Sequence, residues 1–239
     1  MIPGDDDDDE RPWRLAFFFD KRLALLALGL VGAVALWLAW RTPEREGFGY
    51  HELGEGDGAP TVVLLHGYGA PGDDLTRVGE VIVDGLPGVR VICVEGAVSV
   101  GLGGRAWYLD ERQRRGTSAR MARFVESLVE DGTPLDRVVI GGFSQGAAIA
   151  GDVGARLPGL AGTALLSGDH STREPIRGRL FVSHGRADPV LSFGAAERRL
   201  EDYRASATVT FAPFDGGHRI QPAEAELVRW LGEALGLGG

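Results

Sequence analysis

Three side chains in this sequence of 239 residues, Ser144, Asp188 and His218, are of the types that together perform nucleophilic acyl transfer. Ser144 stands in the motif Gly-Phe-Ser-Gln-Gly, residues 142–146, between an apolar run and a stretch that favours a helix. A strand that enters a helix through G-x-S-x-G is typical of the nucleophile elbow, a tight turn that exposes the serine hydroxyl. Glycine is expected at 142 and 146 because a side chain at either position would collide with the neighbouring strand or helix. The alternative is a glycine-rich loop with an incidental serine.

The elements around Asp188 and His218 predict that both side chains reach the same edge of a sheet as Ser144. Residues 180–182 form an apolar, strand-like run, and Asp188 follows it in a loop. Residues 208–211 form the next strand-like run, and His218 follows that one. The order serine, acid, histidine is the one expected downstream of a nucleophile elbow. Because the carboxyl ends of neighbouring parallel strands share one edge, we expect the three side chains to meet there.

Four short motifs carry a resemblance to a known family: LLHGYGA at residues 64–70, GFSQGA at 142–147, HGRADPV at 184–190 and GGH at 216–218. Together they resemble the phospholipase/carboxylesterase family of α/β hydrolases, which includes the acyl-protein thioesterases, over about residues 50–236. The resemblance implies an α/β-hydrolase fold, with a mostly parallel central sheet, helices on both faces and no large lid domain. It also implies a serine hydrolase that cleaves carboxylic esters or thioesters. Eukaryotic members usually have GFSQGG, and Ala147 departs from that pattern.

The resemblance assigns roles to further residues. The backbone N–H groups of Tyr68 and Gln145 would form the oxyanion hole, which stabilises the negative charge of the tetrahedral intermediate. The HGRADPV motif favours Asp188 as the acid over Asp169, which follows the preceding strand-like run.

Trp107 and Tyr108 lie in a segment similar to one that lines the acyl or alcohol pocket in related esterases, so both are candidates for the substrate pocket. The alternative is an aromatic cluster that closes the edge of the core. We interpret His66 as a structural hydrogen-bonding residue and Cys93, the single cysteine, as a core residue. The histidines and acidic residues are too scattered to suggest a metal site, and no cofactor is implied.

An uncharged apolar stretch at residues 23–40 predicts a transmembrane helix before the hydrolase domain. Eighteen helical residues at 1.5 Å each span about 27 Å, close to the hydrocarbon thickness of a bilayer. Four basic residues precede the stretch and two, Arg41 and Arg45, follow it. This bias favours a single-pass anchor with the hydrolase domain on the extracytoplasmic side. The alternative is a protein secreted after cleavage of a signal peptide, with Ala33-Val34-Ala35 as the cleavage motif.

The chain is therefore expected to have four parts: an acidic, disordered tail at 1–22, the transmembrane helix at 23–40, a linker at 41–49 and the hydrolase domain at 50–239. Five Asp and one Glu at residues 5–10 form the block of like charge that predicts the tail. Within the domain, apolar residues at helical spacing predict a helix over 118–130. The net charge of −9 argues against a nucleic-acid partner.

Two other classes of protein fit the same pattern: a membrane-anchored protein of hydrolase fold that binds ligands without catalysis, and a serine peptidase or depolymerase. The first usually lacks one of the three reactive residues, and the second often needs an added domain or lid. Here all three candidates are present, with 44 positions between Ser144 and Asp188 and 30 between Asp188 and His218. These gaps accommodate the core sheet and leave no room for a large lid. We therefore favour an esterase or thioesterase that acts on a small-molecule or lipid-like acyl substrate.

Overall fold

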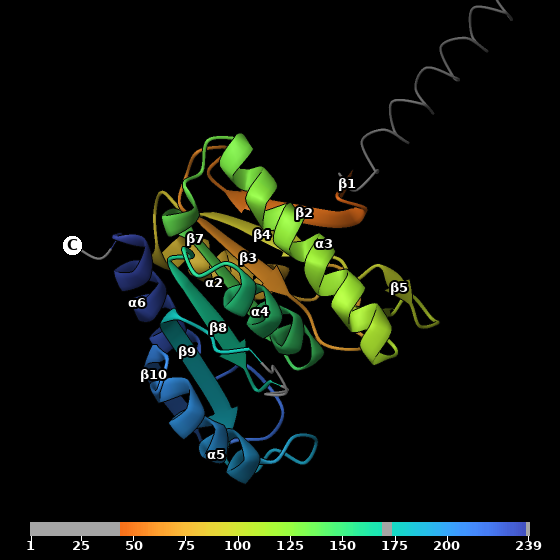
Figure 1. The fold of residues 1–239 in the computed structure, drawn as a ribbon, viewed down its shortest axis with the longest axis vertical. Coiled ribbons are helices and arrows are strands. Elements are labelled where there is room, and N and C mark those ends of the chain that lie inside the picture. The colour runs from red at the N-terminus through yellow and green to blue at the C-terminus, as the bar shows by residue number, and fades with distance from the viewer. Residues whose placement is uncertain (1–43, 169–173, 238–239) are drawn as a thin grey trace, which may run out of the picture. The chain divides into compact units, whose positions relative to one another are not determined.

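An eight-stranded sheet is the frame of the computed structural model, which describes residues 44–168 and 174–237 (Figure 1). From one edge to the other, the strands are β1 (Glu44–Arg45), β2 (Phe48–Gly54), β4 (Arg90–Val94), β3 (Thr61–Leu65), β7 (Val138–Phe143), β8 (Gly162–Leu166), β9 (Gly178–Gly185) and β10 (Ala207–Phe214). β2 is antiparallel to both of its neighbours, whereas all neighbours from β4 to β10 are parallel. The predicted, mostly parallel central sheet is confirmed.

The burial of the strands follows from their place in the sheet. Every residue of β3, β4 and β8 is buried, as expected for parallel strands that are covered on both faces. β10 lies at the edge, and the exposure of its residues alternates along the strand. The continuous apolar runs in the sequence therefore mark the strands that are covered on both faces of the sheet.

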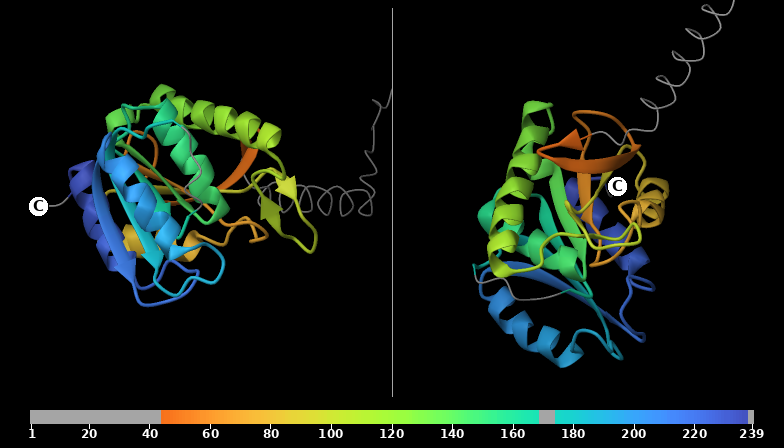
Figure 2. Two further views of the ribbon diagram at one scale, coloured as in Figure 1. Left: turned by 60° about the horizontal axis from the view of Figure 1, so that its bottom comes forward. Right: turned by 90° about the vertical axis from the view of Figure 1, so that its right-hand side faces the viewer.

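Helices cover both faces of this sheet, as predicted (Figure 2). α3 (Glu111–Glu130), α4 (Gln145–Arg156) and α5 (Phe193–Arg204) pack on one face, in a core that includes Phe124, Ile149 and Tyr203. α2 (Thr76–Gly85) and α6 (Glu224–Leu235) pack on the other, around Ile82 and Trp230. The chain also forms a short turn of helix, η1 (Leu135–Arg137), and, after β4, a hairpin of β5 (Val98–Ser99) and β6 (Arg105–Ala106).

The folded domain begins before the predicted boundary. The range 41–49, predicted as a linker, includes β1 and the first two residues of β2. Phe48 is fully buried in the core beside Trp107 and Phe124, and the guanidinium of Arg120 lies 4.4 Å from the centre of its ring. Glycines on both sides of Phe48 interrupt the apolar pattern, so the sequence did not distinguish the start of β2 from a linker.

α3 also begins earlier than the helix predicted over 118–130. It starts at Glu111 because Asp110 caps it: the Asp110 side chain accepts a hydrogen bond from the backbone N–H of Gln113 at 2.8 Å. The first turns of α3 carry charged and polar residues, so the apolar pattern does not mark them.

The acidic tail and the predicted membrane segment at 23–40 lie outside the described residues. In the part of the chain that the structure describes, no helix combines the length and the apolar character needed to cross a bilayer. The membrane anchor therefore stays a prediction from the sequence.

Candidate active site

Ser144, Asp188 and His218 lie together at the carboxyl edge of the sheet. Ser144 stands between β7 and α4, Asp188 follows β9, and His218 follows β10. His218 Nε2 lies 2.8 Å from Ser144 Oγ, and His218 Nδ1 lies 2.8 Å from Asp188 Oδ2. A carboxylate only accepts hydrogen bonds, so Nδ1 carries the proton and Nε2 is left to accept the serine proton. Asp169, the alternative acid, lies outside the described residues.

The backbone at Ser144 has the strained conformation of a nucleophile elbow. Its φ of 54° and ψ of −115° are values that residues other than glycine rarely adopt. A Cβ at Gly142 would lie 2.2 Å from the carbonyl oxygen of Gly146, and one at Gly146 would lie 2.2 Å from that of Leu65. The turn is therefore packed too closely for a side chain at either position, which explains the two glycines as expected. Ser144 is also the N-cap of α4, but its side chain makes no capping bond and is directed to His218 instead.

Asp188 is held in its ionised form by hydrogen bonds. Its side chain is fully buried, and Oδ1 accepts bonds from the backbone N–H groups of Val190 and Leu191 at 2.8 and 2.9 Å. Burial by itself raises the pKa of this carboxyl, but the bonds from Leu191, His218 and Val190 outweigh it and hold the pKa below its ordinary value. An ionised Asp188 fixes the His218 tautomer and can stabilise the imidazolium that forms when Ser144 loses its proton.

Two polar residues that the sequence did not single out support these loops. His184 is fully buried, and its Nε2 lies 3.3 Å from Asp188 Oδ2. Ser167, which follows β8, donates its hydroxyl to the carbonyl oxygen of Arg219, 2.8 Å away and next to His218 in the chain. The signal for His184 was its place four residues before the acid in HGRADPV, and Ser167 carried no signal beyond its position at a strand end.

The loops that carry Tyr68 and Gln145 flank the point where the strand order reverses, between β3 and β7. Tyr68 follows β3, and its side chain is 59% exposed, while Gln145 is the first residue of α4. A Cβ at Gly67 would lie 3.3 Å from the Cβ of Ser144, so the first loop packs directly against the serine. Among the described residues, no hydrogen-bond acceptor engages the backbone N–H of Tyr68 or of Gln145. Both groups are therefore available to an oxyanion.

His66 and Cys93 are buried residues of the core, as expected. Nδ1 of His66 bonds to the carbonyl oxygen of Gly67 at 2.7 Å, and Nε2 accepts from the backbone N–H of Gly96 at 2.9 Å. Burial lowers the pKa of His66, which keeps the ring neutral in this arrangement. Burial also raises the pKa of the Cys93 thiol to about 12, so this side chain is a poor nucleophile. Within the described ranges, no cluster of three or more His, Cys, Asp or Glu side chains is suited to a metal ion.

Of the two candidate pocket residues, Trp107 does not reach an open pocket. Its side chain is fully buried beside Phe48 and His66, and its Nε1 donates to the carbonyl oxygen of His66 at 2.7 Å. The alternative interpretation, an aromatic cluster that closes the edge of the core, is the one that fits Trp107. Tyr108 is half-buried, packs against the same core, and has the guanidinium of Arg114 5.8 Å from its ring centre.

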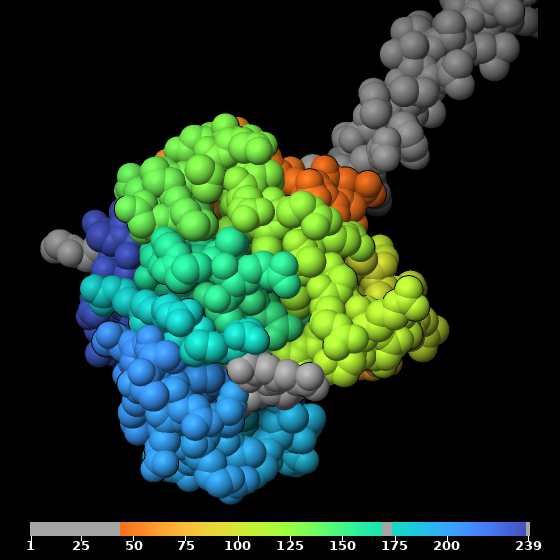
Figure 3. Space-filling model, in the orientation of Figure 1, coloured from red at the N-terminus to blue at the C-terminus, as the bar shows by residue number. Residues whose placement is uncertain are grey.

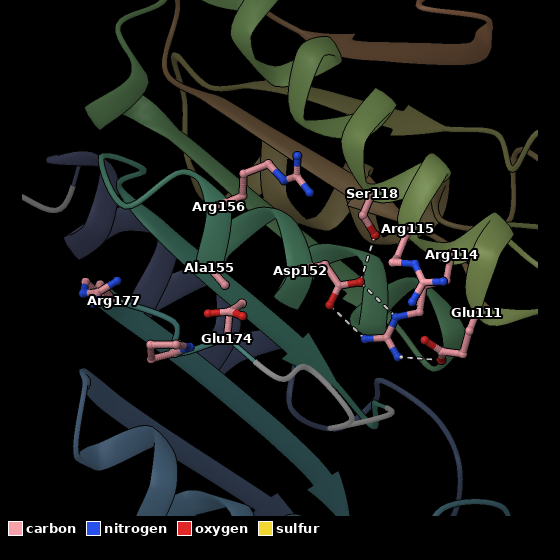
Figure 4. Close-up of a pocket in the computed structure, with 10 residues that line it drawn as sticks. Glu111, Arg114, Arg115, Ser118, Asp152, Ala155, Arg156, Glu174 and Arg177 are labelled. Atoms are coloured by element: carbon pink, nitrogen blue, oxygen red, sulfur yellow. Dashed lines mark hydrogen bonds and ion pairs between the residues drawn. The ribbon is translucent and has the colours of Figure 1, made fainter.

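A separate cavity of about 400 Å³ lies beside α3 and α4, on the face of the molecule seen in Figure 3, and none of Ser144, Asp188 and His218 lines it. Figure 4 shows that one side of this cavity is a polar cluster between the two helices. Arg114 binds both carboxylate oxygens of Asp152 at 2.9 Å, and Ser118 donates to the same carboxylate at 2.8 Å. Because these groups satisfy one another, the cluster joins α3 to α4.

The helix-covered parallel sheet, with its strained turn after β7 and the histidine and acid bonded in line behind the serine, defines an α/β hydrolase. The family model described as phospholipase/carboxylesterase matches residues 52–230. The chain belongs to this family, as its motifs predicted, and this places it among the hydrolases of the esterase and thioesterase type.

Individual relatives agree with this assignment. Acyl-protein thioesterase 1 of Cryptococcus neoformans var. neoformans serotype D is 26% identical over 223 residues, which cover 73% of this chain and 92% of the relative. The structure of a Bacillus cereus carboxylesterase is 21% identical, with a TM-score of 0.67 over 78% of this chain and 94% of that one. A Mesorhizobium loti carboxylesterase is 24% identical, with a TM-score of 0.67 over 80% and 97% of the two chains. The solved structures show that the fold is shared.

Proposed function

We propose that this protein hydrolyses carboxylic esters or thioesters through an acyl-enzyme intermediate on Ser144. The observation that carries the proposal is the unbroken line of hydrogen bonds, each 2.8 Å long, from Ser144 Oγ through His218 to Asp188. Membership in the phospholipase/carboxylesterase family supports it. The reaction needs no cofactor, because each step moves only protons and electron pairs among these side chains, the substrate and water.

In the first half of the proposed reaction, His218 Nε2 removes the hydroxyl proton as Ser144 Oγ attacks the carbonyl carbon of the substrate. The backbone N–H groups of Tyr68 and Gln145 stabilise the charge on the former carbonyl oxygen. The imidazolium, stabilised by Asp188, then gives its proton to the leaving alcohol or thiol as the C–O or C–S bond breaks. In the second half, His218 takes a proton from water as the water oxygen attacks the acyl carbon. The imidazolium then returns this proton to Ser144 Oγ as the bond between Oγ and the acyl carbon breaks, which releases the carboxylic acid and the free serine.

Exposed apolar side chains on the loops of this domain support an apolar acyl substrate. Four large apolar side chains, Tyr68, Leu102, Leu109 and Val190, are at least 58% exposed. Tyr68 lies in the loop after β3, and Leu102 lies in the turn between β5 and β6. Leu109 follows β6, and Val190 lies two residues after Asp188. Backbone hydrogen bonds of 2.8 Å join the hairpin to the loop after β3. Apolar side chains exposed around a reactive centre favour contact with an acyl chain or another lipid-like group.

A nucleophile variant tests the proposal. Ser144→Ala should fold as the wild type does and lose the hydrolysis of p-nitrophenyl esters by several orders of magnitude. A fluorophosphonate probe should label the wild type and leave Ser144→Ala unlabelled. Substantial turnover by the purified variant would reject Ser144 as the nucleophile. A wild type that neither turns over acyl esters and thioesters of varied chain length nor reacts with the probe would indicate a binding protein instead.

We further propose that residues 23–40 anchor the protein in a membrane with the hydrolase domain on the extracytoplasmic side. The uncharged stretch, its length and the excess of basic residues before it support this location. The single cysteine is compatible with an oxidising compartment, because Cys93 is buried and has no second cysteine to pair with.

Fractionation and protease protection test this location. The full chain should stay with membranes after a carbonate wash. Removal of residues 1–41, which keeps β1 and the rest of the sheet, should release a soluble, active enzyme. Protease added to spheroplasts should digest the hydrolase domain. Protection in intact spheroplasts with digestion after lysis would reverse the orientation, and a mature protein shortened near Ala35 would replace the anchor with a cleaved signal.

A further inference from the structure

Trp107 lies between the two loops that carry the proposed oxyanion donors and bonds to both. Its indole Nε1–H donates to the carbonyl oxygen of His66, two residues before Tyr68, at 2.7 Å. Its backbone N–H donates to Oε1 of Gln145, the other donor residue, at 2.9 Å. One fully buried residue thus connects the loop after β3 to the first turn of α4.

The residues beside Trp107 extend this connection along the bridging segment, residues 105–108. Gln145 Nε2 donates to the carbonyl oxygen of Tyr108 at 2.8 Å, so both ends of the glutamine amide bond to this segment. Arg105 exchanges two backbone hydrogen bonds, both 2.8 Å long, with residues 69–70. The loop after β3 is therefore held on both sides of Tyr68, and the same segment holds Gln145.

The separation between the two loops matters because an oxyanion hole works only when both donors are about 3 Å from the oxygen that develops the charge. The loop after β3 has no regular secondary structure of its own, and its place relative to α4 depends on what it contacts. The bridging segment makes these contacts with a part-buried hydrogen bond of 2.9 Å and a buried one of 2.7 Å, and neither needs a substrate. Such bonds set the geometry before the reaction begins.

We propose that Trp107 and the side chain of Gln145 are positioning residues of the oxyanion hole, which hold the backbone N–H groups of Tyr68 and Gln145 at their working separation. The inference rests on the proposed esterase function and adds to it one residue and one side chain that act through other groups. Trp107, which the sequence left open between the substrate pocket and a core cluster, acts on the transition state through His66 and Gln145.

Two variants remove these bonds and keep most of the side-chain volume. Trp107→Phe removes the indole N–H that holds His66, and Gln145→Met removes both amide bonds but keeps the backbone N–H. Trp230→Phe is the matched control, because Trp230 is 4% exposed and lies in the core on the opposite face, with its ring centre 5.5 Å from that of Phe181. Active sites in each full-length protein are counted by titration with a fluorophosphonate. The assays then give kcat and KM per active site with p-nitrophenyl butyrate, and the inhibition constant of a trifluoromethyl ketone.

In both variants, kcat per active site should fall about 10- to 100-fold, while KM stays within about threefold of the wild type. The trifluoromethyl ketone forms a tetrahedral adduct with the serine, so its binding should weaken by a similar factor. Trp230→Phe should keep the wild-type kcat per active site even if its melting temperature falls. A purely structural role would lower the melting temperature or the number of titrated sites and leave kcat per site unchanged.

Unchanged kcat per site in Trp107→Phe and Gln145→Met, beside an active wild type, would overturn the positioning roles and leave the proposed esterase function intact. An equal loss of kcat per site in Trp230→Phe would also overturn the positioning roles, because the loss would then follow from the substitution of any tryptophan in the core. A wild type that neither hydrolyses the ester nor reacts with the fluorophosphonate would overturn the proposed function and this inference with it.

Discussion

Gly146→Ala adds one methyl group at the tightest contact of the nucleophile elbow. The new Cβ would lie 2.2 Å from the carbonyl oxygen of Leu65 and 2.6 Å from that of His66. Ordinary contact begins at 3.4 Å, so the start of α4 and the end of β3 must separate by the difference, 1.2 Å. Both neighbours are backbone atoms, which cannot rotate away as the end of a flexible side chain can.

This separation acts directly on the proposed oxyanion hole, because Gln145 precedes Gly146 and Tyr68 lies three residues after Leu65. A misplacement of about 1 Å in an active site costs on the order of 100-fold in rate. We therefore expect kcat/KM for p-nitrophenyl butyrate to fall about 100-fold. Overpacking costs about 1–3 kcal/mol, and urea unfolding should show a loss of free energy of unfolding of that size.

Gly116→Ala is the matched control, because it makes the same chemical change within α3, where a Cβ would meet nothing within 4 Å. Alanine is favoured over glycine inside a helix by about 0.5–1 kcal/mol, so this variant should gain stability and keep its activity. Wild-type kcat/KM in a folded Gly146→Ala protein would refute the argument that the close packing of α4 on β3 sets the reactive geometry.

The remaining predictions concern the acid, the response to pH and the start of the domain. Asp188→Asn should lower kcat about 10⁴-fold and Asp169→Asn far less, and the reverse ranking would assign the acid to Asp169. Burial lowers the pKa of His66, so below about pH 6.5 the unfolded chain binds a proton there that the folded chain does not. The free energy of unfolding should therefore fall from pH 7 to pH 5, and less steeply in His66→Gln; equal slopes in urea unfolding would contradict this. Phe48→Ala should cost about 3–5 kcal/mol of unfolding free energy. A loss below about 0.5 kcal/mol would mean that this residue belongs to a linker.

The placement of the candidate catalytic residues was predictable because it depends on short stretches of chain. An apolar run followed by a loop places a side chain at a strand end, and parallel strands bring successive ends to one edge. Ser144 and His218 are 74 positions apart, yet their side chains are 2.8 Å apart because the strands before them lie in one sheet. The two glycines of the elbow follow from the same local geometry, since their clashes are with the adjoining turn and strand.

The orientation of Trp107 was not predictable in this way. An aromatic residue after a glycine-rich loop is compatible with a pocket wall and with a core cluster, and the choice depends on what lies behind the ring. Here Phe48 lies 6.0 Å from Trp107 between ring centres, on a strand that the sequence itself did not mark clearly. Phe48 and Trp107, 59 positions apart in ambiguous segments of the chain, thus decide each other's structure, and only tertiary packing resolves both.

Gln145 shows most clearly what a motif leaves unexplained. In the proposed mechanism this position supplies only a backbone N–H, which every residue except proline has. The structure gives a reason for the amide side chain: Oε1 accepts from the backbone N–H of Trp107, and Nε2 donates to the carbonyl oxygen of Tyr108. A glutamate carboxylate would place an acceptor against the carbonyl of Tyr108, and a lysine would place a donor against the N–H of Trp107. Glutamine satisfies both partners, so the identity of this residue follows from the bridging segment and not from the oxyanion that its backbone would bind.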